Sequence, residues 1–186
     1  QLGKDVDKTI IQQSCETVLN SDLLNDDFRP AYESLCRDLN ALVQEQYQPE
    51  LSDLMRIHGD CHVGNLLWRD DQLYMVDFDD CVQGPAMQDI WMLLSGQREE
   101  QLQQLEAIRN GYEVFRPFPY QQLKWIECLR TIRLIKHTAW VVERWSDPAF
   151  SIAFPWFTGV RYWSEHILSL REQLAALQEE SLFIPS

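Results

Sequence analysis

A cluster of polar residues, set between short apolar segments, limits what this chain can fold into more than any other feature of its sequence. Residues 58–65 read HGDCHVGN, and residues 76–80 read VDFDD. The apolar segments around them, at 54–57, 65–69 and 72–78, are short enough to favour strands over helices. Because polar groups are costly to bury unless they are bonded, polar residues held between strands indicate a site.

The spacing of Asp60, Asn65 and Asp77 predicts a metal site. Asp60 and Asn65 flank a loop that contains a glycine, and Asp77 ends the strand segment that follows. If the hairpin closes at Asp70 and Asp71, whose composition is typical of a tight turn, Asp77 comes close to the other two. Carboxylate and amide oxygens suit a hard cation such as Mg²⁺, which keeps waters that substrate phosphates can replace.

These residue types also indicate separate roles. Asp60 is predicted to be the catalytic base or the group that orients an acceptor hydroxyl. Asn65 and Asp77 are predicted to hold the metal that bridges nucleotide phosphates, so Asp77 counts both as a metal ligand and as a catalytic residue. His58, which precedes Asp60 in the same loop, is predicted to fix that loop through hydrogen bonds.

The rest of the chain predicts helices. Apolar residues recur at helical spacing in the stretches 10–19, 28–43, 102–115, about 120–145 and 160–177. The expected fold is therefore mostly α with a small β insert. Its expected parts are leading helices (1–53), the β insert with the catalytic and metal-binding residues (54–84) and a helical subdomain (85–186).

Proline, glycine and aspartate predict where helices begin and end. Pro85 is expected to open a helix that stops at Gly96, because proline favours the first helical turn and glycine the residue after the last. Asp26 and Asp27 are expected to cap the helix that follows them, with Pro30 in its first turn.

Charge and cysteine content exclude several classes of protein. The chain has 16 Lys and Arg against 29 Asp and Glu, a formal net charge of −13. This argues against nucleic acid as a partner, because binding it needs a basic face, and against an anionic membrane surface. The five cysteines form no CxxC pair, which favours a reducing cytoplasm over a disulfide framework.

The motif H-x-D-x-x-x-x-N at 58–65, followed by a strand that ends in D-F, resembles the catalytic and metal-binding loops of the kinase fold. Its His-Gly-Asp form is similar to that of the aminoglycoside phosphotransferase and choline kinase group. The longer segments IHGDCHVGNLLW and VDFDDCVQGPAMQDIWMLL resemble one bacterial branch of that group, the stress response kinase A proteins, as do RWSDPAF and FPWFTG. The likeness is sharpest over residues 55–95.

This resemblance implies a bilobal, protein-kinase-like fold that binds ATP between a β-rich N-lobe and a helical C-lobe, with Mg²⁺ as the metal. It implies Asp60 as the active-site aspartate, and Asn65 and Asp77 as magnesium ligands. Asp89 matches the position whose carboxylate braces the catalytic loop, and Asp79 stands where choline kinases carry a second acid near the metal. The substrate that the stress-kinase branch implies is a Ser or Thr hydroxyl on a protein.

The parts of a kinase that precede its catalytic loop are not recognisable. A kinase holds the nucleotide phosphates with an N-lobe lysine, which pairs with a helix glutamate beneath a phosphate-covering loop. Lys4 is the only lysine before His58, and no glycine-rich turn accompanies it. We therefore expect this chain, which begins with Gln1 rather than Met, to be a C-lobe whose N-lobe lies upstream in the full-length chain. The isolated fragment is expected to be inactive.

Other interpretations of the polar cluster are disfavoured. A calcium loop that starts at Asp77 fails because Val82 replaces the glycine that its sharp turn needs. Zinc on His58, Cys61 and His62 lacks a remaining ligand at a recognised spacing. Cys61 and His62 also make a poor nucleophile pair, because adjacent side chains on an extended loop point to opposite sides.

Basic and aromatic residues in the last third allow two interpretations each. Four basic residues fall on one side of the helix near residue 130: Arg130, Arg133, His137 and Arg144. They would receive an acidic substrate or a phosphate, or, as we favour, form ion pairs within an acidic chain. Four tryptophans follow: Trp140, Trp145, Trp156 and Trp163. They would form an aromatic cage for a quaternary ammonium or, as we favour, pack in the core.

Three functions therefore stand. The first is a Mg²⁺- and ATP-dependent Ser/Thr protein kinase in which Asp60 accepts the hydroxyl proton. The second keeps the kinase fold but phosphorylates a small hydroxylated molecule of aminoglycoside or choline type; acids lining the cleft would favour an amine. The third is a non-catalytic regulatory module derived from a kinase lobe, which the joint presence of Asp60, Asn65 and Asp77 disfavours.

Overall fold

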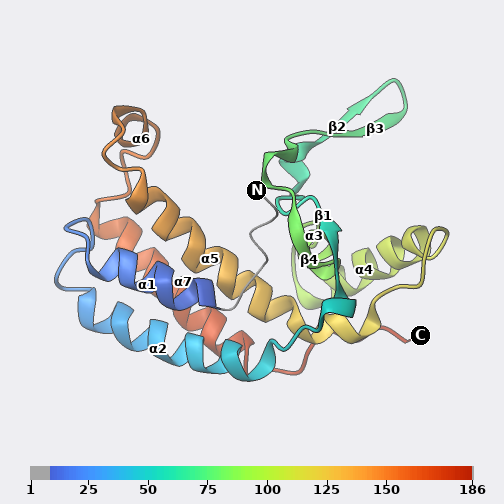
Figure 1. The fold of residues 1–186 in the computed structure, drawn as a ribbon, viewed down its shortest axis with the longest axis horizontal. Coiled ribbons are helices and arrows are strands. Elements are labelled where there is room, and N and C mark those ends of the chain that lie inside the picture. The colour runs from blue at the N-terminus through green and yellow to red at the C-terminus, as the bar shows by residue number, and fades with distance from the viewer. Residues whose placement is uncertain (1–8, 186) are drawn as a thin grey trace. The chain divides into compact units, whose positions relative to one another are not determined.

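The computed structural model describes residues 9–185, so Lys4 lies outside the described residues. The described part of the chain divides into two compact units (Figure 1). The first, called the site unit here, comprises Pro49–Ile126 with residues 180–185. The second, called the helical unit, comprises residues 9–48 with Glu127–Glu179. The polar cluster predicted from the sequence lies entirely in the site unit.

Two antiparallel strand pairs frame the site unit. β1 (Leu54–Ile57) pairs with β4 (Val82–Pro85), and β2 (Leu66–Arg69) pairs with β3 (Gln72–Met75). Between β2 and β3, Asp70 and Asp71 adopt φ angles of 51° and 56°. Positive φ at both central residues is what a two-residue hairpin turn requires. The turn predicted at these two residues is therefore confirmed.

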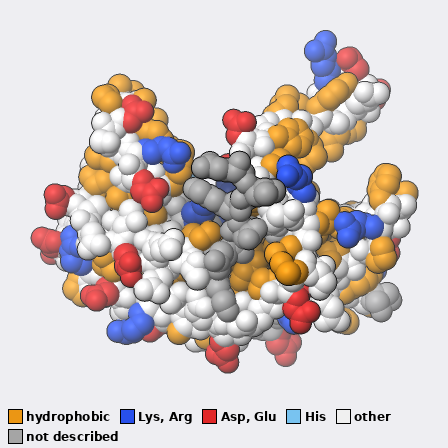
Figure 2. Space-filling model, in the orientation of Figure 1, with side chains coloured by type: hydrophobic (Ala, Val, Ile, Leu, Met, Phe, Trp, Pro, Cys, Tyr) orange, Lys and Arg blue, Asp and Glu red, His pale blue; other side chains and the backbone are white. Residues whose placement is uncertain are grey.

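The β2–β3 hairpin carries apolar side chains that remain in contact with water. Leu67, Trp68, Leu73 and Tyr74 are exposed by 50%, 70%, 56% and 46%, and Figure 2 shows apolar atoms over this hairpin. Burial therefore contributes little to holding the two strands together within the described residues. The turn and the backbone ladder set their register.

Pro85 does not open a helix, contrary to the prediction. It is the last residue of β4 and pairs with Leu54, a place where a residue without an N–H is tolerated. The short helix α3 (Met87–Trp91) follows and ends well before Gly96. Gly96, with φ of 81°, instead forms the turn that leads into α4 (Arg98–Tyr112).

The helical unit consists of five helices: α1 (Thr9–Leu19), α2 (Arg29–Gln46), α5 (Ile126–Glu143, whose first residue belongs to the site unit), α6 (Pro148–Ala153) and α7 (Val160–Ala176). Its core contains side chains with no exposed surface, among them Tyr32, Leu39, Ile135, Trp163 and Leu170. The apolar periodicity that predicted these helices is the same stripe that is buried here, and its burial is the main force that holds them together.

Arg29, rather than a cap from Asp26 or Asp27, fixes the start of α2. Phe28 occupies the N-cap position and offers no side-chain cap. Asp26 instead pairs with Arg29, with 3.2 Å between Oδ1 and Nε. The guanidinium also donates to three backbone carbonyls around the turn that precedes α2, which its forked donors allow. Pro30 lies in the first turn, as predicted.

The secondary structure agrees with the predicted fold class, mostly helix with a small amount of strand. Within residues 9–185, no helix combines the length and the hydropathy that crossing a membrane requires.

Candidate active site

The closed hairpin brings Asn65 beside the residues that follow β3. Leu66 pairs with Met75, and the next rung is a hydrogen bond from the Val76 N–H to the Asn65 carbonyl, at 3.1 Å. Asp77 is therefore the residue directly after the one that faces Asn65. This register, rather than any contact between their side chains, is what relates the two candidate metal ligands.

The carboxylate of Asp89, in α3, accepts two hydrogen bonds from the start of the 58–65 loop. The His58 N–H donates to Oδ2 at 2.7 Å, and the Gly59 N–H donates to Oδ1 at 2.9 Å. Burial raises the pKa of Asp89 above its ordinary value, and the two hydrogen bonds oppose that rise. One side chain thus satisfies two consecutive backbone donors that would otherwise lack partners at the end of β1.

Gly59 allows the loop to pass directly against the segment that follows Asp77. Its φ is 85°, in the left-handed region, and a Cβ at this position would lie 2.3 Å from the carbonyl oxygen of Asp80. A residue with a side chain would therefore have to push two backbone segments apart. The close approach joins the 58–65 loop to the 77–80 turn.

His58 links the loop to the end of β3 through both ring nitrogens. The side chain is buried, with 5% exposed. The Asp60 N–H donates to Nδ1 at 3.3 Å, so Nδ1 carries no proton, and Nε2 donates to the Val76 carbonyl at 2.9 Å. The ring also packs against Phe78, with 4.8 Å between ring centroids. A single imidazole therefore sets the distance between Asp60 and the strand that leads to Asp77.

Asn65 holds the backbone of Asp60. Its Nδ2 donates to the Asp60 carbonyl at 2.9 Å, and the residue is 8% exposed. Because the nitrogen and the oxygen of an amide point in different directions, this bond directs the Asn65 oxygen away from that carbonyl. The Asp60 carboxylate is 20% exposed, and its Oδ2 lies 3.6 Å from the Nε2 of His62.

Asp77 and Asp79 lie in an exposed turn. Asp77 has a φ of 65° and precedes the 3-10 turn Phe78–Asp80. Among residues 9–185, no three His, Cys, Asp or Glu side chains gather as a metal site. The candidate ligands are therefore one amide and one carboxylate, on Asn65 and Asp77. Such an oxygen pair fits a Mg²⁺ ion that takes its other ligands from water and phosphate; the assignment stays a prediction.

Two buried glutamines that the sequence did not single out support the loop. Gln88, 5% exposed, points its Nε2 at the Gly59 carbonyl, at 3.4 Å. Gln122 donates to the Asp53 carbonyl at 3.0 Å and accepts from the Met87 N–H at 3.2 Å. These bonds fix the entry to β1 and the start of α3. The sequence offered only a weak signal for them, namely polar residues within apolar helical segments.

The basic residues of α5 make contacts within the helical unit. Arg130 pairs with Glu127, with 3.0 Å between Nη1 and Oε1. The Arg144 guanidinium lies over the Trp140 ring, 4.9 Å from its centroid. These contacts favour the structural interpretation of the basic stripe.

The tryptophans behave differently from one another. Trp163 has no exposed surface, and its Nε1 donates to the Leu23 carbonyl at 2.9 Å, as the core interpretation expects. Trp156 remains 49% exposed and packs edge-to-face against Phe154. The core interpretation therefore holds for Trp163 and does not extend to Trp156.

Comparison with known proteins agrees with the motifs. A family model described as "Phosphotransferase enzyme family" matches residues 18–126. Stress response kinase A of Escherichia coli is 42% identical over 160 residues, which cover 86% of this chain and 48% of the relative. A Salmonella typhimurium relative named serine/threonine protein kinase RdoA is 46% identical over 144 residues, covering 77% and 43% of the two chains. The resemblance to stress response kinase A is thereby confirmed, and the chain spans about half the length of these curated relatives.

Two solved structures share the fold. A choline/ethanolamine kinase family protein from Mesorhizobium loti gives a TM-score of 0.58 at 15% identity, over 96% of this chain and 59% of that one. A spectinomycin phosphotransferase, solved in complex with ADP and spectinomycin, gives a TM-score of 0.57 at 16% identity, over 92% and 55%. At these identities the likeness concerns the fold alone, and the fold is kinase-like.

Proposed function

Because the chain belongs to the phosphotransferase enzyme family, we propose that it carries the acceptor-activating and metal-binding part of a Mg²⁺- and ATP-dependent kinase. The observation that supports this most directly is the hydrogen-bond network around Asp60. Asp89 holds the two residues before it, His58 accepts from its N–H, and Asn65 donates to its carbonyl. A carboxylate whose backbone is held from three sides is suited to meeting a hydroxyl in a fixed geometry.

In the proposed reaction, Asp60 accepts the proton of the acceptor hydroxyl while the hydroxyl oxygen attacks the γ-phosphorus of ATP. A bond forms between that oxygen and phosphorus, the bond from the γ-phosphorus to the β–γ bridging oxygen breaks, and ADP leaves with the electron pair. Most of the acceleration in such a transfer comes from positioning and charge stabilisation. The protein's own contribution here is the rigid placement of the Asp60 carboxylate.

Asn65 and Asp77 are proposed to hold Mg²⁺, which when bound neutralises charge on the phosphate oxygens. The amide of Asn65 is already oriented by its bond to the Asp60 carbonyl. Asp79 is proposed as a further acid near the metal, since it is exposed in the same short turn that follows Asp77.

Kinases also hold the nucleotide phosphates with a lysine. We propose that the whole gene product supplies this lysine from outside residues 9–185, and that residues 1–186 on their own have little turnover. The relatives that match this chain are about twice the length of the matched part, which supports testing the activity on the whole gene product.

The acceptor is proposed to be a Ser or Thr hydroxyl on a protein, following the printed name of the Salmonella typhimurium relative. A second candidate is a small hydroxylated amine. The observation that favours it is the exposed acidic turn Phe78–Asp80, which carries two aspartates directly after Asp77 and would attract a cation.

The experiment compares the whole gene product with its Asp60→Asn variant, using ATP, Mg²⁺ and a general protein acceptor, and measuring phosphate transfer. Asp77→Asn reports on the proposed metal ligand. Asp71→Asn is the matched control, because Asp71 is an exposed aspartate with positive φ in the hairpin turn. We expect Asp60→Asn to lower kcat by about 100-fold or more, in line with removal of a general base, and Asp71→Asn to leave it unchanged.

The outcomes separate the candidate functions. Transfer to hydroxylated amines but not to protein would favour the small-molecule kinase. Folded Asp60→Asn and Asp77→Asn variants that retain full transfer would refute the proposed catalytic site. No transfer by the wild-type protein to either acceptor class would favour the regulatory module.

A further inference from the structure

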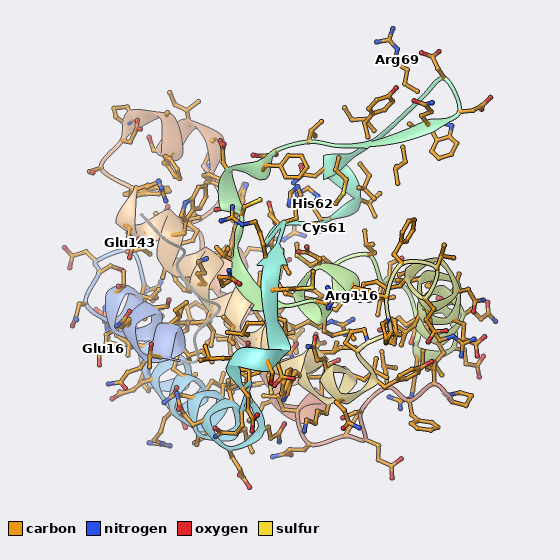
Figure 3. The ribbon with its side chains drawn as sticks, turned by 45° about the vertical axis from the view of Figure 1, so that its right-hand side comes forward. Glu16, Cys61, His62, Arg69, Arg116 and Glu143 are labelled. Atoms are coloured by element: carbon orange, nitrogen blue, oxygen red, sulfur yellow. The ribbon has the colours of Figure 1, made fainter. Side chains whose placement is uncertain are left out.

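His62 lies on the loop that joins β1 to β2 and contacts two different parts of that loop (Figure 3). It is the N-cap of the 3-10 turn Val63–Asn65, where its Nδ1 accepts a hydrogen bond from the Gly64 N–H at 3.0 Å. Its Nε2 lies 3.6 Å from Oδ2 of Asp60, and its side chain is 43% exposed. One ring therefore spans the distance between the turn that carries Asn65 and the carboxylate of Asp60.

The contact with Gly64 determines which ring nitrogen carries the proton. A backbone N–H can only donate, so Nδ1 must be the acceptor and the proton of the neutral ring resides on Nε2. The N–H of His62 thus faces Asp60, and the ring can donate to that carboxylate but cannot, in this tautomer, accept from it.

The loop leaves room for this ring only because residue 64 is glycine. A Cβ on Gly64 would lie 2.7 Å from Cε1 and 2.9 Å from Nδ1 of His62. Any larger residue would therefore displace the imidazole from its place between the turn and Asp60. The fit of Gly64 is independent of the distance to Asp60, and both observations place the ring in the same position.

We propose that His62 is a positioning residue for Asp60. The neutral ring donates its Nε2–H to Oδ2 and thereby fixes the rotation of the carboxylate, so that the other oxygen is presented to the acceptor hydroxyl. The distance of 3.6 Å is longer than a hydrogen bond, and contacts of this kind tighten when the substrate is bound. The proposal rests on the proposed function, in which Asp60 is the base.

Two variants of His62 separate the two ends of the ring. His62→Asn retains a short acceptor that can cap the Gly64 N–H, but has no donor with the reach of Nε2. His62→Gln has an N–H at nearly the reach of Nε2, but lacks the short acceptor. We expect the Asn variant to keep the unfolding temperature and lose kcat by about 10- to 100-fold, the scale of a misplaced catalytic group. The Gln variant is expected to keep kcat within a few-fold and to unfold at a lower temperature.

The measurements are kcat, KM for ATP and thermal unfolding of the whole gene product, with KM for ATP expected to be unchanged in both variants. Gly64→Ala provides a second route, because it leaves His62 in the chain but displaces its ring, and is expected to lower kcat as His62→Asn does. If His62→Asn keeps its kcat, or if His62→Gln loses as much as His62→Asn, His62 is only a cap and the proposal is wrong. Asp60→Asn in the same assay distinguishes this failure from failure of the proposed function, in which Asp60→Asn itself would remain active.

Discussion

Burial of His166 makes the stability of the helical unit depend on pH. His166, in α7, is 5% exposed, and its Nε2 lies 3.3 Å from the hydroxyl of Thr138. Its ring stacks on that of Tyr162, with 5.6 Å between centroids and 9° between planes, and lies 5.9 Å from the ring of Tyr32. Burial, and secondarily the charge of His137, lowers the pKa of His166 from 6.5 to about 4.

The sign of the effect follows from which state binds the proton more tightly. The unfolded chain takes up a proton on this residue near pH 6.5, whereas the folded chain does so only near pH 4. Stability is therefore complete above pH 6.5 and is lost as the pH falls toward 4. A difference of about 2.5 pH units, at about 1.36 kcal/mol each, amounts to roughly 3.4 kcal/mol, most of it developed by pH 4.

The assay compares urea unfolding of the wild-type protein and of His166→Gln, followed by circular dichroism between pH 7.5 and pH 4. Glutamine keeps a polar group near Thr138 but does not titrate. All other groups, including His137, Tyr32 and Tyr162, are present in both proteins, so their contributions cancel in the difference. The stability advantage of the wild type is expected to shrink by about 3 kcal/mol over this range. An advantage that stays constant, or that grows as the pH falls, would show that His166 is not held neutral by burial.

Two further predictions concern the site unit. Asp89→Ala removes the acceptor of the His58 and Gly59 N–H groups and is expected to lower the free energy of unfolding by about 3 to 5 kcal/mol, since bonds to a charged acceptor contribute about 1.5 to 3 kcal/mol each; urea unfolding measures this, and a loss below 1 kcal/mol would contradict the bracing geometry. Gly59→Ala adds a Cβ that would lie 2.3 Å from the Asp80 carbonyl oxygen at a positive φ, and is expected to cost more than about 2 kcal/mol and to lower kcat, whereas Gly111→Ala, where a Cβ meets nothing within 4 Å, is the control that should retain both.

The features that the sequence predicted correctly depend on neighbours along the chain. The turn at Asp70 and Asp71 follows from two residues that tolerate positive φ between apolar strand segments. β1 is found at the residues predicted for it. The helical periodicities of the two ends correspond to α2 and α7 because an apolar stripe and its burial are the same physical fact.

The features that were missed depend on contacts between distant residues. β4 has no alternating pattern of its own and exists because it pairs with β1, so Pro85 ends a strand where local rules favour a helix start. The roles of Gln88 and His62 depend on the positions of Gly59 and Asp60 in space, which no spacing along the chain specifies. Arg29 likewise replaces the expected caps by reaching carbonyls that only the folded turn brings together.

The bonds that assemble the candidate site all close short loops. Asn65 bonds to Asp60 across 5 residues, His58 to Val76 across 18, and Asp89 to Gly59 and His58 across 30 and 31. The entropy lost in closing a loop grows only with the logarithm of its length, and contacts close in sequence form fastest. Residues 58–89 therefore require little of the remaining chain to find their own arrangement, and their native contacts are expected to form early in folding.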